Sequence, residues 1–232
     1  MTYSIVAHDP DTGVLGVATA TGSVAVGGFV AHAKSGAGAI ATQGAFSNWL
    51  YGERGLALLE SGLNARQVRD ELIAWDDGHD QRQLLICDRE GDTAAHTGRH
   101  NLGHKVHHTD AHIAVAGNML ADKAVISEMQ QAYYLSADRE ENMERRLLSA
   151  LAAGYHAGGD FRGTHSAALK VSYVDKPPVD LRVDWAETHC IEHLREVYQH
   201  TLAPAFQGFL EGVPTRTHPT KTGHISDRSV DE

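Results

Sequence analysis

The sequence lacks several features that would tie the protein to a membrane or to an oxidising compartment. Only two cysteines occur in 232 residues, Cys87 and Cys190, and they stand far apart and outside any CxxC pair. This usage is typical of a reducing compartment, although two thiols are enough for one disulfide. The sequence has no run of about 18 apolar residues that could span a membrane, and it begins without the basic and apolar regions of a signal peptide. We therefore expect a cytoplasmic protein with no membrane partner.

Basic residues are also scarce. The chain has 20 Lys and Arg against 30 Asp and Glu, and its formal net charge is −10. Because no basic run interrupts this acidic balance, nucleic acid is not an expected partner. Hydrophobic residues make up 42% of the sequence, enough for a sizeable core. We expect one domain over residues 1–210 and a polar C-terminal tail over residues 211–232.

The hydrophobic pattern predicts strands and helices in separate groups. Strands are expected at 3–7, 14–20, 23–33, 36–42, 83–87, 93–97, 112–116, 166–174 and 179–185. Helices are expected at 51–61, at 64–75 behind a capping box of Asn64 and Gln67, twice within 121–157 with the second starting near Asp138, and at 188–207. Paired helices between groups of antiparallel strands predict an α/β sandwich of the α+β type, with helices outside two stacked sheets.

The first two residues raise a chemical possibility. Methionine followed by a small residue is the kind of start that cellular aminopeptidases trim, and trimming would leave Thr2 with a free amine beside its hydroxyl. That pair of groups is one way to activate a weak hydroxyl nucleophile. The alternative is that Thr2 is an ordinary second residue at the start of an ordinary strand.

Six segments in order along the chain resemble a known family. They are TYSIVAHDPDTGVLGVATA, SGAGAIATQ, YGERGLALL, AAHTG, AVAGNML and GGDFRGTHSAAL. They are similar to the bacterial and archaeal family catalogued as domain of unknown function 1028, which is grouped by fold with the N-terminal-nucleophile (Ntn) hydrolases. The resemblance covers about residues 2–205. The resemblance implies a four-layer αββα sandwich. It also implies that Thr2 is the nucleophile in a cleft between the sheets, with its own α-amine as base and backbone N–H groups holding the oxyanion.

Lys34 resembles the basic residue that Ntn peptidases place beside the nucleophile. A cation there would keep the α-amine of Thr2 neutral, because the ordinary pKa of such an amine is near 8. The alternative is a solvated lysine at the end of a strand.

Other polar positions could bind substrate. Arg162 could clamp a substrate carboxylate with Asp160 orienting it, or the two residues could form an internal salt bridge after a helix C-cap. Asn118, at the end of a strand, could offer an amide to the oxyanion or the substrate, and Gln43 and Gly44 hold a similar position. Ordinary turn residues would look the same.

Histidine is abundant, with 16 in the chain. Six fall in the segment 96–112: His96, His100, His104, His107, His108 and His112. Because no HExxH and no cysteine or carboxylate pair accompanies them, we expect a solvent-exposed loop and no metal site. A metal-binding protein remains an alternative.

The sequence thus predicts an amide-bond hydrolase of the Ntn type that needs no cofactor and acts on a small amide or peptide-like substrate. The alternative is a non-catalytic protein that keeps the fold and binds a small molecule or peptide. A homo-dimer is expected in either case, because an exposed sheet edge needs cover.

Overall fold

The computed structural model describes residues 2–223. The strands are β1 (Thr2–His8), β2 (Leu15–Thr21), β3 (Ala31–Lys34), β4 (Gly38–Gly44), β5 (Arg82–Asp88), β6 (Thr93–Thr97), β7 (His104–Asp110), β8 (Ile113–Leu120), β9 (Ser166–Ser172) and β10 (Val179–Val183). The helices are α1 (Leu50–Glu60), α2 (Ala65–Trp75), α3 (Ala124–Ala137), α4 (Met143–His156), α5 (Cys190–Thr201) and α6 (Pro204–Gly212), with short 3₁₀ helices η1 (Val26–Gly28) and η2 (His79–Gln81).

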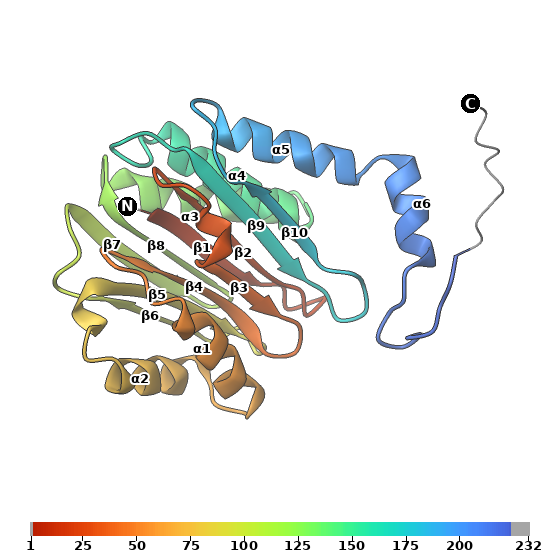
Figure 1. The fold of residues 1–232 in the computed structure, drawn as a ribbon, viewed down its shortest axis with the longest axis horizontal. Coiled ribbons are helices and arrows are strands. Elements are labelled where there is room, and N and C mark those ends of the chain that lie inside the picture. Colours follow the sequence, from red (N-terminus) through yellow and green to blue (C-terminus); the bar gives the residue numbers. More distant parts are fainter. Residues whose placement is uncertain (1, 224–232) are drawn as a thin grey trace.

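The strands form two sheets, and every pairing in them is antiparallel. One sheet has six strands in the order β10-β9-β2-β1-β8-β7, and the other has four in the order β3-β4-β5-β6 (Figure 1). The long first hairpin, β1 and β2, therefore lies at the centre of the larger sheet. The predicted α+β architecture with antiparallel sheets is confirmed.

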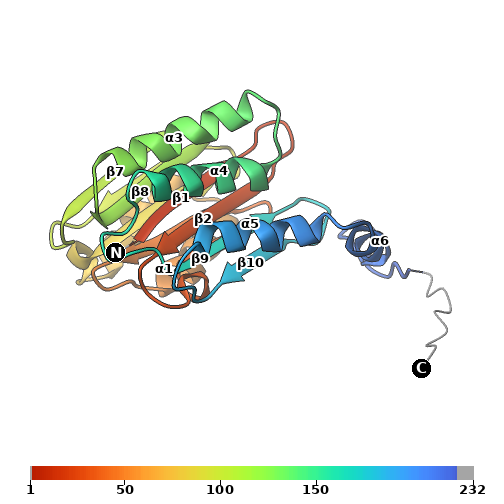
Figure 2. The ribbon, with the colours of Figure 1, turned by 90° about the horizontal axis from the view of Figure 1, so that it is seen from above.

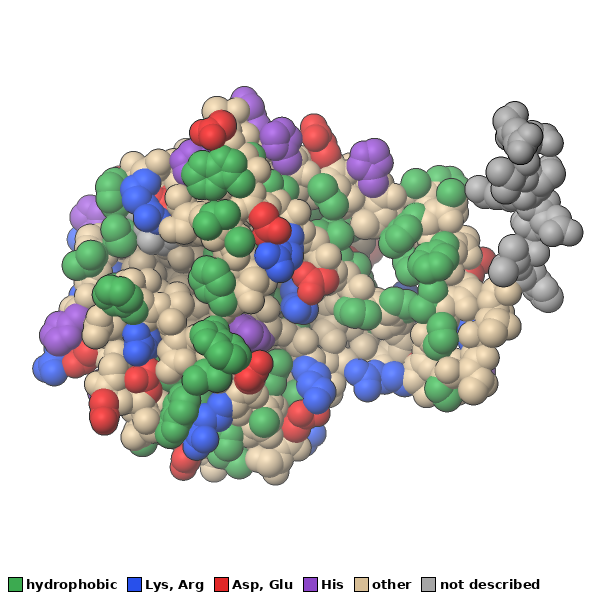
Figure 3. All heavy atoms as spheres, in the orientation of Figure 1, with side chains coloured by type: hydrophobic (Ala, Val, Ile, Leu, Met, Phe, Trp, Pro, Cys, Tyr) green, Lys and Arg blue, Asp and Glu red, His purple; other side chains and the backbone are tan. Residues whose placement is uncertain are grey.

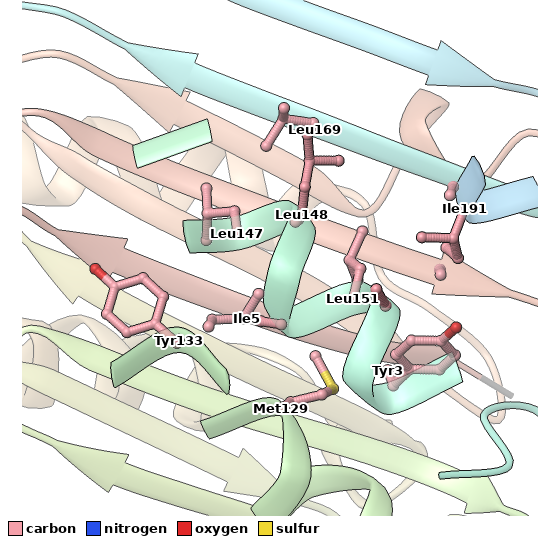
Figure 4. Close-up of a cluster of buried hydrophobic side chains, with 14 of the residues drawn as sticks. Tyr3, Ile5, Met129, Tyr133, Leu147, Leu148, Leu151, Leu169 and Ile191 are labelled. Carbon is pink, nitrogen blue, oxygen red and sulfur yellow. The ribbon is translucent and has the colours of Figure 1, made fainter. Parts of the chain in front are cut away.

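Helices cover the outer face of each sheet, and three apolar clusters hold the layers together. Helices α3, α4 and α5 lie against the six-stranded sheet (Figure 2), where side chains such as Tyr3, Met129 and Leu151 interlock (Figure 4). Helices α1 and α2 pack on the four-stranded sheet through a second cluster that includes Ile40. A third cluster, containing Val17, lies between the two sheets.

Local sequence signals explain several of these elements. The carboxylate of Asp9 accepts hydrogen bonds from the backbone N–H groups of Asp11 and Thr12, which closes the turn between β1 and β2. The predicted capping box is present, because Asn64 and Gln67 each accept a hydrogen bond from the other's backbone N–H at the start of α2. These short-range bonds fix where both elements begin.

Three element boundaries differ from the prediction. In the predicted strand 23–33, η1 comes first and only the segment from Ala31 onward is extended. The second helix of its pair begins after Asn142 rather than near Asp138, because the Asn142 side chain accepts from the Arg145 backbone N–H and caps the helix. The predicted helix 188–207 is two helices, since Pro204 cannot continue α5 and instead occupies the first turn of α6.

The histidine-rich segment also differs from the prediction. Its central part, His104–Asp110, is strand β7 at the edge of the six-stranded sheet, not a loop. Most of its side chains are exposed. Because both sides of the strand are partly solvated, its sequence does not show the alternation that marks a half-buried strand.

The C-terminal region extends away from the sheets. Helix α6 lies beyond the end of α5 (Figure 1), and the Asp175 carboxylate accepts hydrogen bonds from the backbone and hydroxyl of Thr217. Of the predicted tail, residues 224–232 lie outside the described residues. Among residues 2–223 no helix is long and apolar enough to cross a membrane. Cys87 and Cys190 are both buried and unpaired.

Candidate functional site

One end of the six-stranded sheet gathers polar residues around Thr2. Thr2 opens the central strand β1, where it pairs with Thr21 on β2 and with Asn118 on β8. Thr21 in turn pairs with Ser166 on β9. The Thr2 hydroxyl donates a hydrogen bond of 3.3 Å to the Thr21 hydroxyl, and both residues are buried. We call this end of the sheet the Thr2 end.

Gln43 connects the smaller sheet to the Thr2 end. Its amide Nε2 donates to the carbonyl of Thr2 at 3.1 Å and to Oε1 of Gln83 at 2.6 Å. Its Oε1 accepts from the hydroxyl of Ser4 at 2.5 Å. All of these residues are buried, so Gln43 belongs to a polar network between the sheets and its amide is already occupied.

Asn118 joins the same network but keeps one free acceptor. Its Nδ2 donates to Gln83 Oε1 at 3.0 Å, while its Oδ1 is buried and has no hydrogen-bond partner in residues 2–223. Gln83 further donates to the hydroxyl of Thr97 and to the carbonyl of Gly117. Gln83 was not singled out from the sequence, where the only signal is a glutamine at the start of an otherwise apolar strand.

The turn that carries Asp160 and Arg162 is attached to the Thr2 end. The Asp160 Oδ2 accepts from the backbone N–H of Gly22, the residue after Thr21, at 2.5 Å. Arg162 donates to both carboxylate oxygens of Asp160, at 3.2 and 3.0 Å, which is the predicted internal salt bridge. The Asp160 side chain is fully buried, whereas that of Arg162 is 36% exposed, so the guanidinium still reaches solvent.

Gly44 is held in a conformation that requires glycine. Its φ is +136°, and a Cβ at this position would lie 2.4 Å from the carbonyl oxygen of Gln81. The next residue, Ala45, donates its backbone N–H to the Asn101 side chain. Gly44 therefore ends β4 with a sharp change of direction beside Gln43.

The structure does not bring Lys34 to the Thr2 end. Its ammonium pairs with Glu60 on α1 at 2.5 Å, and both side chains are nearly half exposed. The next backbone N–H, of Ser35, donates to the hydroxyl of Ser172. Ser172 pairs with Leu15 on β2, and Leu15 pairs with His8 at the far end of β1. Lys34 thus lies at the end of the sheets opposite Thr2.

The histidines make pairwise contacts rather than a larger cluster. The Nδ1 atoms of His8 and His112 are 3.1 Å apart, and Nδ1 of His107 is 2.8 Å from the hydroxyl of Thr97. In the part of the chain that the structure describes, no group of three or more His, Cys, Asp or Glu residues is placed to hold a metal ion.

The fold and the polar Thr2 end define an α+β protein with two antiparallel sheets and a candidate site where the central hairpin ends. The sequence matches the family of unknown function DUF1028 over residues 2–194, and the chain belongs to this family. It is 36% identical to protein SPO2555 from Silicibacter pomeroyi, whose crystal structure superposes with a TM-score of 0.90 and matches over 96% of this chain and 99% of that one.

More distant comparisons add little. The structure of Anbu (ancestral beta-subunit) from Yersinia bercovieri is 12% identical, with 88% of this chain and 96% of that one covered and a TM-score of 0.36. A likeness of this size supports no conclusion about function. No curated protein matches the sequence.

Proposed function

We propose that this protein is an amide-bond hydrolase of the Ntn type with the Thr2 hydroxyl as nucleophile. The supporting observation is the gathering of polar groups around Thr2: hydroxyls from β2, amides from β4 and β8, and the turn of Asp160 and Arg162. These groups come from segments far apart in the sequence, and they meet at the residue where a free α-amine would lie after removal of Met1. The substrate class is a small amide or peptide-like molecule.

The chemistry follows from the positions of these groups. Thr2 Oγ attacks the amide carbonyl carbon while the α-amine of Thr2 takes the hydroxyl proton and returns it to the leaving amine. Water then hydrolyses the ester that joins the acyl group to Thr2. The Thr21 hydroxyl orients Thr2 Oγ, and the unpaired Oδ1 of Asn118 can accept an N–H from the α-amine or the substrate. The exposed part of Arg162 anchors an anionic substrate group.

Lys34 has no part in this mechanism, because it pairs with Glu60 at the opposite end of the sheets. That placement favours a second candidate, a non-catalytic protein that keeps the fold and binds a small molecule or peptide. Lys34 therefore supplies no cation that would lower the pKa of the α-amine from its ordinary value near 8.

A substrate-independent test separates the two candidates. A β-lactone probe acylates nucleophilic threonines, and intact mass spectrometry of untagged protein reports both the adduct and the presence of Met1. We expect loss of Met1 and one adduct on Thr2. Thr2→Ala should abolish the adduct, Thr2→Ser should retain it, and Thr109→Ala, at an exposed threonine on β7, should leave it unchanged. An unchanged adduct in Thr2→Ala, or a chain that retains Met1, would exclude the hydrolase and leave the binding protein.

A further inference from the structure

Two neighbouring cavities lie at the end of the six-stranded sheet opposite Thr2. The first is bordered by the turn after His8, by the loop after Ser172 and by the start of α4. The first cavity has a volume of about 560 Å³, and a second of about 520 Å³ continues between β10, α5 and α6. Figure 3 shows a gap in the surface between α6 and the body of the molecule. The two cavities share four lining residues: Asn142, Glu144, Tyr173 and Lys176.

Glu144 lines both cavities and carries an unsatisfied carboxylate oxygen. The residue is only 4% exposed. Its Oε1 accepts a hydrogen bond from the Tyr173 hydroxyl, but its Oε2 is buried with no hydrogen-bond partner in residues 2–223. Burial and the hydrogen bond to Glu144 raise the pKa of Tyr173 far above its ordinary value, so the phenol stays a donor. A buried carboxylate oxygen without a donor is unfavourable, and it points to a missing cationic or N–H partner.

A cation lies over the ring of Tyr173. The ammonium of Lys176 is 5.7 Å from the centre of the Tyr173 ring, and Lys176 makes no ion pair with any acid in the described residues. The two aspartates that line the first cavity are already occupied. Asp9 pairs with Arg146 at 3.1 Å, and Asp175 accepts from the backbone and hydroxyl of Thr217.

We propose that this cavity binds a zwitterionic amino acid, with its ammonium on Glu144 Oε2 and its carboxylate on Lys176 Nζ. Glu144, with its open acceptor, and Lys176, with its unpaired ammonium, line the same two cavities, and they contact Tyr173 at its hydroxyl and over its ring respectively. The apolar lining of Val14, Met143 and Val174 suits an aliphatic side chain. This site is separate from the Thr2 end and does not depend on the proposed hydrolase activity.

Calorimetric titration with three probes of similar shape tests the proposal. L-leucine carries both charges, 3-methylbutylamine only the ammonium, and 4-methylpentanoate only the carboxylate. We expect L-leucine to bind, and each single-charge probe to bind at least about tenfold more weakly, because each lacks one charge-assisted hydrogen bond. No heat with L-leucine at millimolar concentration, or equal affinity for either single-charge probe, would overturn the proposal.

Variants locate the site on the chain. Glu144→Gln and Lys176→Met should each weaken L-leucine binding at least about tenfold. Glu192→Gln is the matched control, because Glu192 also has a buried Oε2 without a hydrogen-bond partner in residues 2–223 but lines neither cavity. The affinity of this variant for L-leucine should be unchanged. If circular dichroism shows that Glu144→Gln does not fold, the affinity of Lys176→Met for L-leucine decides the test, because Lys176 is exposed. Unchanged affinity in the variant that folds, or an equal loss in Glu192→Gln, would contradict the assignment.

Discussion

At the scale of single residues, Gln43 has the most consequential set of contacts. Its side chain bonds the carbonyl of Thr2 and the side chains of Ser4 and Gln83, and all four residues are buried. Buried polar groups have few replacement partners, so a network of this kind is sensitive to the loss of any member.

Gln43→Leu should therefore destabilise the protein. The change leaves the Thr2 carbonyl, the Ser4 hydroxyl and the Gln83 amide each short of a partner, and we expect the free energy of unfolding to fall by about 2–4 kcal/mol. Urea denaturation measures this. Gln131→Leu, at an exposed position on α3, is the matched control and should change stability by less than about 0.5 kcal/mol. Equal stability of both variants would show that the network contributes little.

The pairing of His8 with His112 gives stability a pH dependence. Burial, and secondly the neighbouring His112, lower the pKa of His8 below 6.5, while Asp9, Asp88 and Glu90 act in the opposite direction more weakly. The unfolded chain then binds a proton near pH 6.5 that the folded chain takes up only at lower pH. The free energy of unfolding should fall as pH drops from about 6.5 towards the folded pKa, and level off below it.

Denaturation at pH 8.0, 6.5 and 5.5 tests this dependence. His8→Asn should lose less stability on acidification than the parent protein does, whereas His100→Asn, at an exposed turn position, should follow the parent. Some dependence should remain in His8→Asn, because burial also lowers the pKa of His32 and of His107. An identical pH profile in His8→Asn would rule out His8 as the source.

At the scale of elements, the start of α2 offers a clear test of local sequence signals. Asn64→Ala removes the acceptor for the Gln67 backbone N–H, and loss of such a cap costs about 1 kcal/mol of stability. Arg66→Ala, at an exposed position of the same helix, should be nearly neutral. Thermal unfolding of both variants checks the difference, and equal melting temperatures would mean that the capping box does not stabilise the fold.

Elements with short-range signals could be predicted, and those shaped by distant contacts could not. The Asp9 turn and the Asn64 cap depend on residues within four positions of each other. Strand β7 lies at the edge of its sheet and is held by pairing with β8 alone. Its polar composition therefore predicted a loop. The predicted helix start near Asp138 was wrong, because Asn142 caps α4 and Glu141 accepts from the Ser136 hydroxyl in the turn before it.

The candidate site was predictable only in part, for a related reason. Thr2 was singled out from its place after Met1 and from the family resemblance, and Asn118 and Asp160 from their places at a strand end and after a helix. The structure gathers all three at one end of the larger sheet. Lys34 was assigned through its resemblance to the basic residue of Ntn peptidases, but the direction in which β3 runs carries it to the opposite end. Strand direction depends on which strands pair, and this information is not local.

At the scale of the whole molecule, assembly remains to be tested. Strands β7 and β10 are the two edges of the larger sheet, and apolar side chains including Phe206 and Phe209 gather over α6 (Figure 3). Such surfaces favour association, and we expect a twofold dimer. Light scattering at micromolar concentration should return twice the chain mass of 25.1 kDa. A single-chain mass would contradict the expectation.

The apolar layer between the two sheets contains many small side chains. Nearly half of its buried side chains are single methyl groups: Ala31, Ala39, Ala41, Ala114, Ala116 and Ala168. Side chains this small interlock less than large ones and do little to prevent one sheet from sliding over the other. Gln43 and Gln83 extend from the smaller sheet to backbone carbonyls of Thr2 and Gly117 in the larger one. Hydrogen bonds are strongly directional, so these two glutamines fix the alignment of the sheets, and the position of Thr2 depends on that alignment.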